Sequence, residues 1–238
     1  MTPDVSIIYE DHYVVVVNKP AGLVVHGDGR TNEPALTDWV LERYPHLENI
    51  GEPMRAGGKE FARPGIVHRL DRETSGVIVI AKNQKTFLYL KKQFQERRIT
   101  KTYRAFIHGV PKEREGVIDR PIGRSAKDFR QLSSERGAKG VLREATTAYT
   151  VLKTNDEFSY LDVRPKTGRT HQIRVHLKAI SHPVVCDKLY APKRPCALGF
   201  DRLALHAFSL TFRLPNDCSI TAEAPLPDDF ERALKFFS

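Results

Sequence analysis

The sequence has few cysteines and no long apolar run, and both shortages exclude whole classes of protein. Its three cysteines, Cys186, Cys196 and Cys218, are an odd number without CxxC spacing. A disulfide scaffold is therefore not expected, and we predict a reducing, cytoplasmic location. No apolar run approaches the roughly 20 residues of a membrane span. The N-terminus lacks the basic and apolar regions of a secretory signal, so we expect no membrane partner.

The motifs that bind common cofactors are also missing. The chain has no Walker phosphate loop, no GxGxxG after a strand, no HExxH and no GxSxG elbow. His171 and His176 are five residues apart, which places them about 140° apart on a helix and suits no shared metal ion. We therefore predict no cofactor and no metal.

Positive charge is abundant and unevenly distributed. The 238 residues carry a formal net charge of +9, with 38 Lys and Arg against 29 Asp and Glu. Basic residues concentrate in three stretches, 82–114, 120–143 and 164–178, while residues 1–60 are acidic. Segregation of this kind favours a polyanionic partner, although a solvated helix face with basic loops would give the same pattern.

The pattern of apolar residues predicts an α+β fold with a mixed, mostly antiparallel sheet flanked by helices and loops. We expect a loop over residues 49–65 and a polar connection with short extended pieces over 111–143. Strands are expected at 7–10, 13–17, 77–81, 102–107, 145–152 and 160–163, with a late hairpin at 203–214 and 219–224. Helices are expected at 36–44, 84–98 and 171–180, and after Pro227.

One segment combines charge with a turn directly before a buried strand. It reads His68-Arg69-Leu70-Asp71-Arg72-Glu73-Thr74-Ser75-Gly76. Arg69 and Arg72 would stabilise the ionised Asp71 carboxylate. In an extended segment, Arg69 and Asp71 would also project to the same side. The alternative is a structural salt bridge beside a turn.

A second basic segment covers residues 164–176. If Thr170 caps the helix, His171, Arg174 and Lys178 lie within about 60° of one another. The first helical turn would then offer cations and backbone N–H groups to a phosphate or a carboxylate. The alternative is an ordinary basic surface helix.

These segments carry a family resemblance that spans nearly the whole chain. VHRLDRETSGVIVIAK (67–82) resembles the signature motif of the RluA family of RNA pseudouridine synthases, whose pattern is HRLDxxTSG. Four further stretches resemble that family's other motifs in the family's order: VVNKPAGLVVH (16–26), KTYRAFIHG (101–109), PKTGRTHQIRVHLKAISHPVVCDKLY (165–190) and RLALHAFSLTF (202–212).

The resemblance implies a pseudouridine synthase fold and a cofactor-free isomerase that converts specific uridines of structured RNA into pseudouridine. It makes Asp71 the catalytic carboxylate, acting either as a nucleophile or as the base that gives a glycal intermediate. Arg69 corresponds to the residue that fills the space of the flipped base, and Tyr103 to the ring that stacks on the uracil. Arg174 corresponds to the partner of the catalytic carboxylate, and Leu205 to an apolar contact below the base.

Other expectations concern RNA capture and organisation. The resemblance makes residues 1–238 a single catalytic domain without the extra N-terminal RNA-binding domain of many relatives. RNA contacts would then come from the basic stretches, including Lys91, Arg98, Lys101, Arg169 and His171. We interpret 120–143 as a loop that orders on RNA, with a surface linker as the alternative. We expect a monomer without an obligate protein partner.

Three functions are compared. The first is an RNA pseudouridine synthase acting on large-subunit ribosomal RNA, with transfer RNA or both RNAs as the alternative substrate. The second is a non-catalytic RNA-binding assembly factor, which would need none of Asp71, Tyr103 and Arg174 as a set. The third is a glycosidic hydrolase, disfavoured because no second carboxylate sits in a comparable motif.

Overall fold

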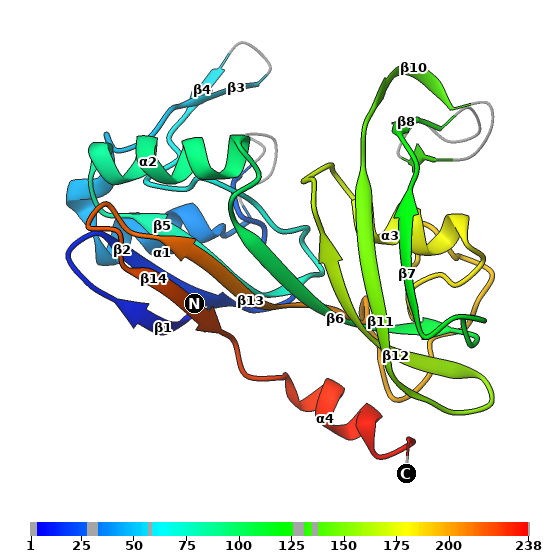
Figure 1. Ribbon diagram of the computed structural model, residues 1–238. Coiled ribbons are helices and arrows are strands. Elements are labelled where there is room, and N and C mark those ends of the chain that lie inside the picture. Colours follow the sequence, from blue (N-terminus) through cyan, green and yellow to red (C-terminus); the bar gives the residue numbers. More distant parts are fainter. Residues whose placement is uncertain (1–3, 28–32, 57–58, 126–130, 135–137, 238) are drawn as a thin grey trace. The chain divides into compact units, whose positions relative to one another are not determined.

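The chain folds into two compact units, seen in the computed structural model in Figure 1. The structure describes residues 4–27, 33–56, 59–125, 131–134 and 138–237. The first unit comprises residues 1–100 and 207–225, and the second comprises 101–206 and 226–238. No helix among the described residues is long and apolar enough to cross a membrane.

The first unit is built on a sheet whose central strand is buried on both faces. Its strand order is β1 (Ser6–Glu10), β2 (Val14–Lys19), β5 (Ser75–Ala81) and β13 (Leu205–Arg213), with β14 (Ser219–Glu223) paired to β13. The β1–β2, β2–β5 and β13–β14 pairs are antiparallel. All seven residues of β5 are buried, as the apolar run 77–81 predicts.

Two helices accompany this sheet, α1 (Leu36–Arg43) and α2 (Gln84–Gln95). Phe87 and Leu90 of α2 pack against alternate residues of the sheet, including Val16 and Val79. Asn83 caps α2 by accepting a hydrogen bond from the Thr86 N–H, at 2.9 Å. The predicted helix 84–98 is therefore present but ends three residues earlier.

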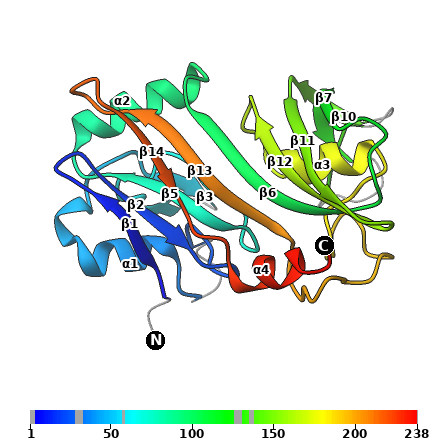
Figure 2. The same cartoon turned by 60° about the horizontal axis from the view of Figure 1, so that its bottom comes forward.

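The antiparallel strands of the second unit follow the order β6 (Thr100–His108), β12 (Phe158–Pro165), β11 (Thr146–Thr154) and β7 (Glu115–Asp119). Helix α3 (Gln172–Ala179) contributes Ile173 and Leu177 to its core. The C-terminal helix α4 (Asp228–Leu234) is seen in Figure 2. Its residues Phe230 and Ala233 belong to the same core. The predicted α+β class with a mostly antiparallel sheet is confirmed.

Short strands lie where the sequence predicts loops or connections. The predicted loop 49–65 contains a two-stranded pair, β3 (Met54–Ala56) and β4 (Lys59–Phe61), preceded by a 3-10 turn at Pro45–Leu47. The described part of 120–143 forms a small sheet of β8 (Ile122–Arg124), β9 (Leu132–Ser133) and β10 (Lys139–Arg143). Residues 126–130 and 135–137 of that segment lie outside the described residues.

A disulfide joins buried Cys186 to exposed Cys196, while Cys218 is a free, exposed thiol. The sequence does not predict this pairing. It closes a short loop that contains Asp187 and Tyr190. The cytoplasmic location stays a prediction.

The disulfide gives a first testable prediction, Cys196→Ser. A cross-link over a sequence separation of 10 restricts the unfolded chain. Its removal should therefore lower the free energy of unfolding by about 3 kcal/mol. Urea denaturation of the oxidised proteins measures this difference, and reductant should abolish it. Cys218→Ser is the matched control and should change nothing. Equal stability of wild type and Cys196→Ser without reductant would contradict a formed disulfide.

Candidate active site

The Asp71 loop leads into the buried strand β5. The Thr74 N–H donates to the Asp71 carbonyl, at 3.1 Å, and so closes a turn. Leu70, Thr74 and Ser75 are buried, whereas Arg69 is exposed and Asp71 is half-buried. The sequence thus places an apolar anchor before the turn and a rigid strand after it, with Asp71 held between them.

Gly76 fixes the end of this turn. Its φ is +115°, and a Cβ at this position would lie 2.1 Å from the Ala207 carbonyl oxygen on β13. Only glycine permits both the backbone conformation and this close approach of two strands. These two constraints explain why the signature motif has a glycine at position 76.

A fully buried lysine holds the Asp71 loop against the N-terminal motif. The Lys19 ammonium donates to three carbonyl oxygens: those of Pro20 and Leu23, both at 2.8 Å, and that of Arg72, at 3.0 Å. The Gly22 N–H donates to the same Arg72 carbonyl, at 2.9 Å. An ammonium has three donors, so these contacts match its capacity. The sequence does not single out Lys19, which lies two residues after an apolar run in the NKPAG stretch.

Two neighbours of Asp71 in the sequence, Arg72 and His68, have partners elsewhere in the first unit. Arg72 forms an ion pair with Glu33, a residue far away in the sequence. His68 accepts a hydrogen bond from the Val79 N–H, at 3.1 Å, and stacks on Phe94. Its ring therefore helps to fasten the segment to β5 and α2.

A basic group lies close to Arg69. His26 is partly buried, and neither of its ring nitrogens has a hydrogen-bond partner among the residues that the structure describes. Burial, followed by the charges of Arg63 and Arg69, lowers the pKa of His26 to about 3. The ring is therefore neutral at neutral pH, and it adds no positive charge beside Arg69.

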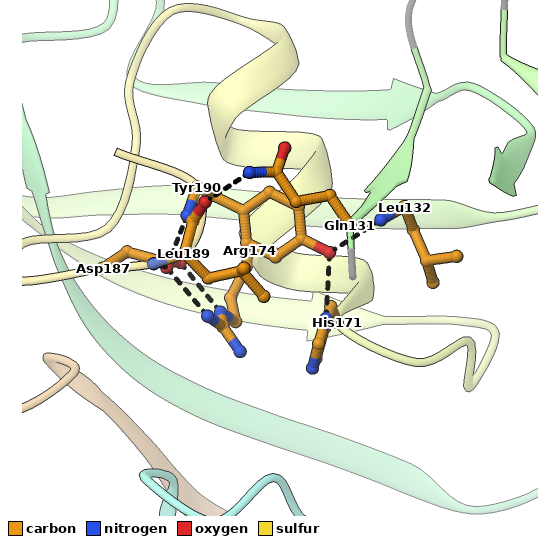
Figure 3. Close-up of polar contacts among 7 residues, drawn as sticks. All are labelled: Gln131, Leu132, His171, Arg174, Asp187, Leu189 and Tyr190. Carbon is orange, nitrogen blue, oxygen red and sulfur yellow. Dashed lines mark hydrogen bonds and ion pairs between the residues drawn. The ribbon is translucent and has the colours of Figure 1, made fainter. Parts of the chain in front are cut away.

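In the second unit, Arg174 of α3 is largely buried. Its side chain is only 10% exposed and forms a bidentate ion pair with Asp187, which is fully buried (Figure 3). Arg174 Nε donates to Asp187 Oδ2 and Nη2 donates to Oδ1, both at 2.8 Å. The Tyr190 ring lies against the guanidinium, and Arg174 Cζ is 5.0 Å from the centroid of that ring.

The start of α3 also needs a correction. The N-cap is His171, in the left-handed conformation with φ of 54°, and not Thr170. The Gln172 amide oxygen accepts from Thr167 Oγ1 at 2.6 Å and from the Arg169 N–H at 3.0 Å. These contacts shift the first helical residue to Gln172 and fold the preceding turn back on the helix.

Three residues predicted to bind RNA make local contacts in the second unit. Lys101 Nζ donates to the Thr167 carbonyl, and Arg169 Nε donates to the Glu144 carbonyl, both at 3.0 Å. His171 Nδ1 lies 2.9 Å from the Tyr190 hydroxyl. In the first unit, Lys91 forms an ion pair with Glu52, and Arg98 with Glu96.

The remaining predicted residues lie on strands and belong to the second unit, which includes the first two residues of β13. Tyr103, on β6 opposite Val163 of β12, is half-buried and packs against the core. Leu205, the first residue of β13, is buried in that core and is 3% exposed. Arg69 and Asp71 thus share one loop of the first unit, while Tyr103, Arg174 and Leu205 belong to the second.

His176 has ordinary structural partners and does not join His171 in a metal site. Its Nδ1 lies 2.9 Å from Thr147 Oγ1, and its Nε2 lies 2.9 Å from the Arg120 carbonyl. Burial lowers the pKa of His176, so the ring is neutral. No group of three or more His, Cys, Asp or Glu suited to a metal ion occurs among the described residues.

Comparison with known proteins gives the family. Residues 13–179 match the RNA pseudouridylate synthase family. The chain is 37% identical over 97% of its length to an RNA pseudouridine synthase of Synechocystis, of which it covers 68%. It is also 37% identical over 96% of its length to ribosomal large subunit pseudouridine synthase D of Neisseria meningitidis, of which it covers 60%.

Solved structures agree. Human RNA pseudouridylate synthase domain containing 4 is similar with a TM-score of 0.75 and 28% identity, over 97% of this chain and 92% of that one. The chain therefore belongs to the RNA pseudouridine synthases of the RluA family, and it is an isomerase of RNA uridines. The family and the enzyme class predicted from the motifs are confirmed.

The buried ammonium of Lys19 gives the second testable prediction, Lys19→Met. Methionine fills similar space but leaves three carbonyl oxygens without their donor. The free energy of unfolding should therefore fall by about 3 kcal/mol or more. Urea denaturation tests this, with Lys92→Met on the exposed face of α2 as the control. A loss no larger than that of the control would contradict the structural role of Lys19.

Proposed function

We propose that this enzyme converts specific uridines of large-subunit ribosomal RNA into pseudouridine, with Asp71 as the catalytic group. The observation that supports the role of Asp71 is the fixed backbone of its loop. The Thr74 N–H bonds to the Asp71 main-chain carbonyl, and the Lys19 ammonium bonds to the Arg72 main-chain carbonyl. The ribosomal substrate rests on the similarity to the ribosomal large subunit pseudouridine synthase D of Neisseria.

The reaction rearranges bonds within one nucleotide. The bond between C1′ and N1 of uracil breaks, the base turns, and C5 bonds to C1′. C5 then loses its proton and N1 gains one, so the product has the same composition as the substrate. Asp71 would assist either by attacking as a nucleophile or by removing a sugar proton to give a glycal. Both routes require an ionised carboxylate.

Access to the uridine requires base flipping, at a cost of a few kcal/mol. In this proposal the exposed Arg69 fills the space that the base leaves, and the Tyr103 ring stacks on the uracil. Arg174 pairs with the Asp71 carboxylate, and the Leu205 side chain makes an apolar contact below the base. A binding protein without catalysis would need none of these roles.

Asp71→Asn is the third testable prediction. The amide has the same shape but cannot act as a base or a nucleophile, so pseudouridine formation should fall by roughly 10²–10⁴-fold or more. Release of tritium from RNA that carries [5-³H]uridine measures the reaction. RNA affinity should stay close to that of the wild type. Asp156→Asn, an exposed acid of the second unit, is the control. Comparable activity of Asp71→Asn would contradict the proposal.

The choice of RNA needs its own test. Pseudouridines should be mapped in total RNA from a strain that lacks the gene. Loss of a site in large-subunit ribosomal RNA, restored by wild-type enzyme and not by Asp71→Asn, supports the proposed substrate. Losses confined to transfer RNA would replace it with the alternative substrate.

The basic end of α2 gives the fourth testable prediction. Lys91 and Arg98 form ion pairs that remain partly solvent-exposed, and such pairs are weak enough to yield to phosphates. Lys91→Ala with Arg98→Ala should weaken RNA binding and reduce the slope of log K against log salt by about 1.4–1.8. Lys153→Ala with Lys235→Ala is the control pair. An unchanged slope would show that α2 does not contact RNA.

A further inference from the structure

The loop that the disulfide closes, residues 187–195, is basic and largely exposed. Its one acidic residue, Asp187, is buried and paired, so it adds no negative charge to the surface. Its cations all lie on the exposed part of the loop and are Lys188, Lys193 and Arg194. They fall outside the three basic stretches that the charge distribution of the sequence identifies. The 187–195 loop therefore presents a positive surface of its own to a polyanion.

The 187–195 loop also supports part of the basic segment 120–143. The Tyr190 hydroxyl accepts from the Leu132 N–H, at 3.0 Å, and the Gln131 amide donates to the Leu189 carbonyl, at 2.7 Å (Figure 3). Tyr190 shares a small apolar cluster with Ile122 of β8, and Leu132 of β9 packs against this cluster. A small cluster stabilises its surroundings weakly, so the arrangement of these strands depends on how firmly the loop is held.

The two sulfurs of the disulfide differ in access. Cys186 is 4% exposed and belongs to the main core of the second unit, whereas Cys196 is exposed. Arg194 and Lys193 lie just before Cys196, and nearby positive charge stabilises a thiolate. A disulfide with an exposed sulfur exchanges readily with external thiols. In the reducing location that the sequence predicts, disulfides are usually transient and act as redox sensors.

The exchange is balanced by a low-molecular-weight thiol. Its thiolate attacks the exposed Cys196 sulfur, the bond between the two protein sulfurs breaks, and Cys186 leaves as a thiolate that takes up a proton. A second thiol attacks the mixed disulfide and releases Cys196. One protein disulfide and two thiols thus give two protein thiols and one low-molecular-weight disulfide, and the reverse reaction closes the loop again.

We propose that the 187–195 loop is an RNA contact whose affinity is set by the redox state of Cys186 and Cys196. The inference rests on the proposed function for the ribosomal RNA that the loop contacts. The disulfide holds the loop and the 131–132 segment in one arrangement before RNA binds. After reduction, RNA must first order a freer loop, and this loss of conformational freedom weakens binding.

The affinity of the two redox forms tests the proposal directly. The dissociation constant for an in vitro transcript of large-subunit ribosomal RNA is measured with oxidised and with dithiothreitol-reduced wild-type protein. Reduction should weaken binding about 10-fold, within the usual coupling between two sites of roughly 5–150-fold. Cys196→Ser should bind like the reduced form and ignore reductant, whereas Cys218→Ser should respond like the wild type. Equal dissociation constants of the two wild-type forms would overturn the proposal.

Lys193→Ala with Arg194→Ala tests the contact of the loop with RNA. In the oxidised protein, the slope of log K against log salt should fall by about 1.4–1.8, because two phosphates lose their cations. Lys153→Ala with Lys235→Ala is again the control pair. A slope equal to that of the control would overturn the assignment of the loop as an RNA contact.

Reciprocity between the two equilibria gives a test that needs no variant. If the disulfide tightens RNA binding by some factor, saturating RNA must favour disulfide formation by the same factor. Thiol blocking and mass spectrometry measure the oxidised fraction across glutathione buffers, with and without the transcript. An oxidised fraction that RNA does not change would overturn the proposal. Failure of the proposed function looks different, because neither redox form would then make pseudouridine in the transcript, whatever the two dissociation constants are.

Discussion

A buried ammonium organises the part of this enzyme that carries Asp71, the proposed catalytic carboxylate. Lys19 is fully buried and bonds to three carbonyl oxygens, one of which belongs to Arg72, the neighbour of Asp71. This contact joins the end of β2 to the loop that enters β5, so the position of Asp71 depends on a residue 52 positions earlier in the chain. The short-range turn to Thr74 and the glycine at position 76 then complete the loop.

The second unit handles an arginine by the same physical principle, with the charges reversed. There a buried carboxylate, Asp187, bonds to Arg174 and to the backbone of its own turn. In both units a long cationic side chain lies in a fixed place because every contact with its anion or dipole is short and shielded from water.

Much of the scaffold follows from local sequence pattern. The apolar run at 77–81 and the three- and four-residue spacing of Phe87, Leu90 and Phe94 predict β5 and α2 correctly. The pair β3–β4 is missed because its short strands lie in a stretch of glycine and charge without alternation. The start of α3 is one residue off, since His171 adopts a left-handed conformation that depends on tertiary contacts.

The site residues divide in the same way. The motifs identify Asp71 and Arg174 but not the residues that hold them in place. Lys19 and Asp187 make their contacts only in the folded chain, and no spacing rule predicts those contacts. The most direct test of the account is a crystal structure of the enzyme with RNA that carries 5-fluorouridine at the target position. We predict that the Asp71 carboxylate and the Arg174 guanidinium lie about 3 Å apart, with the modified ring stacked on Tyr103. An Arg174 turned away from Asp71 and bound only to phosphate would contradict the account.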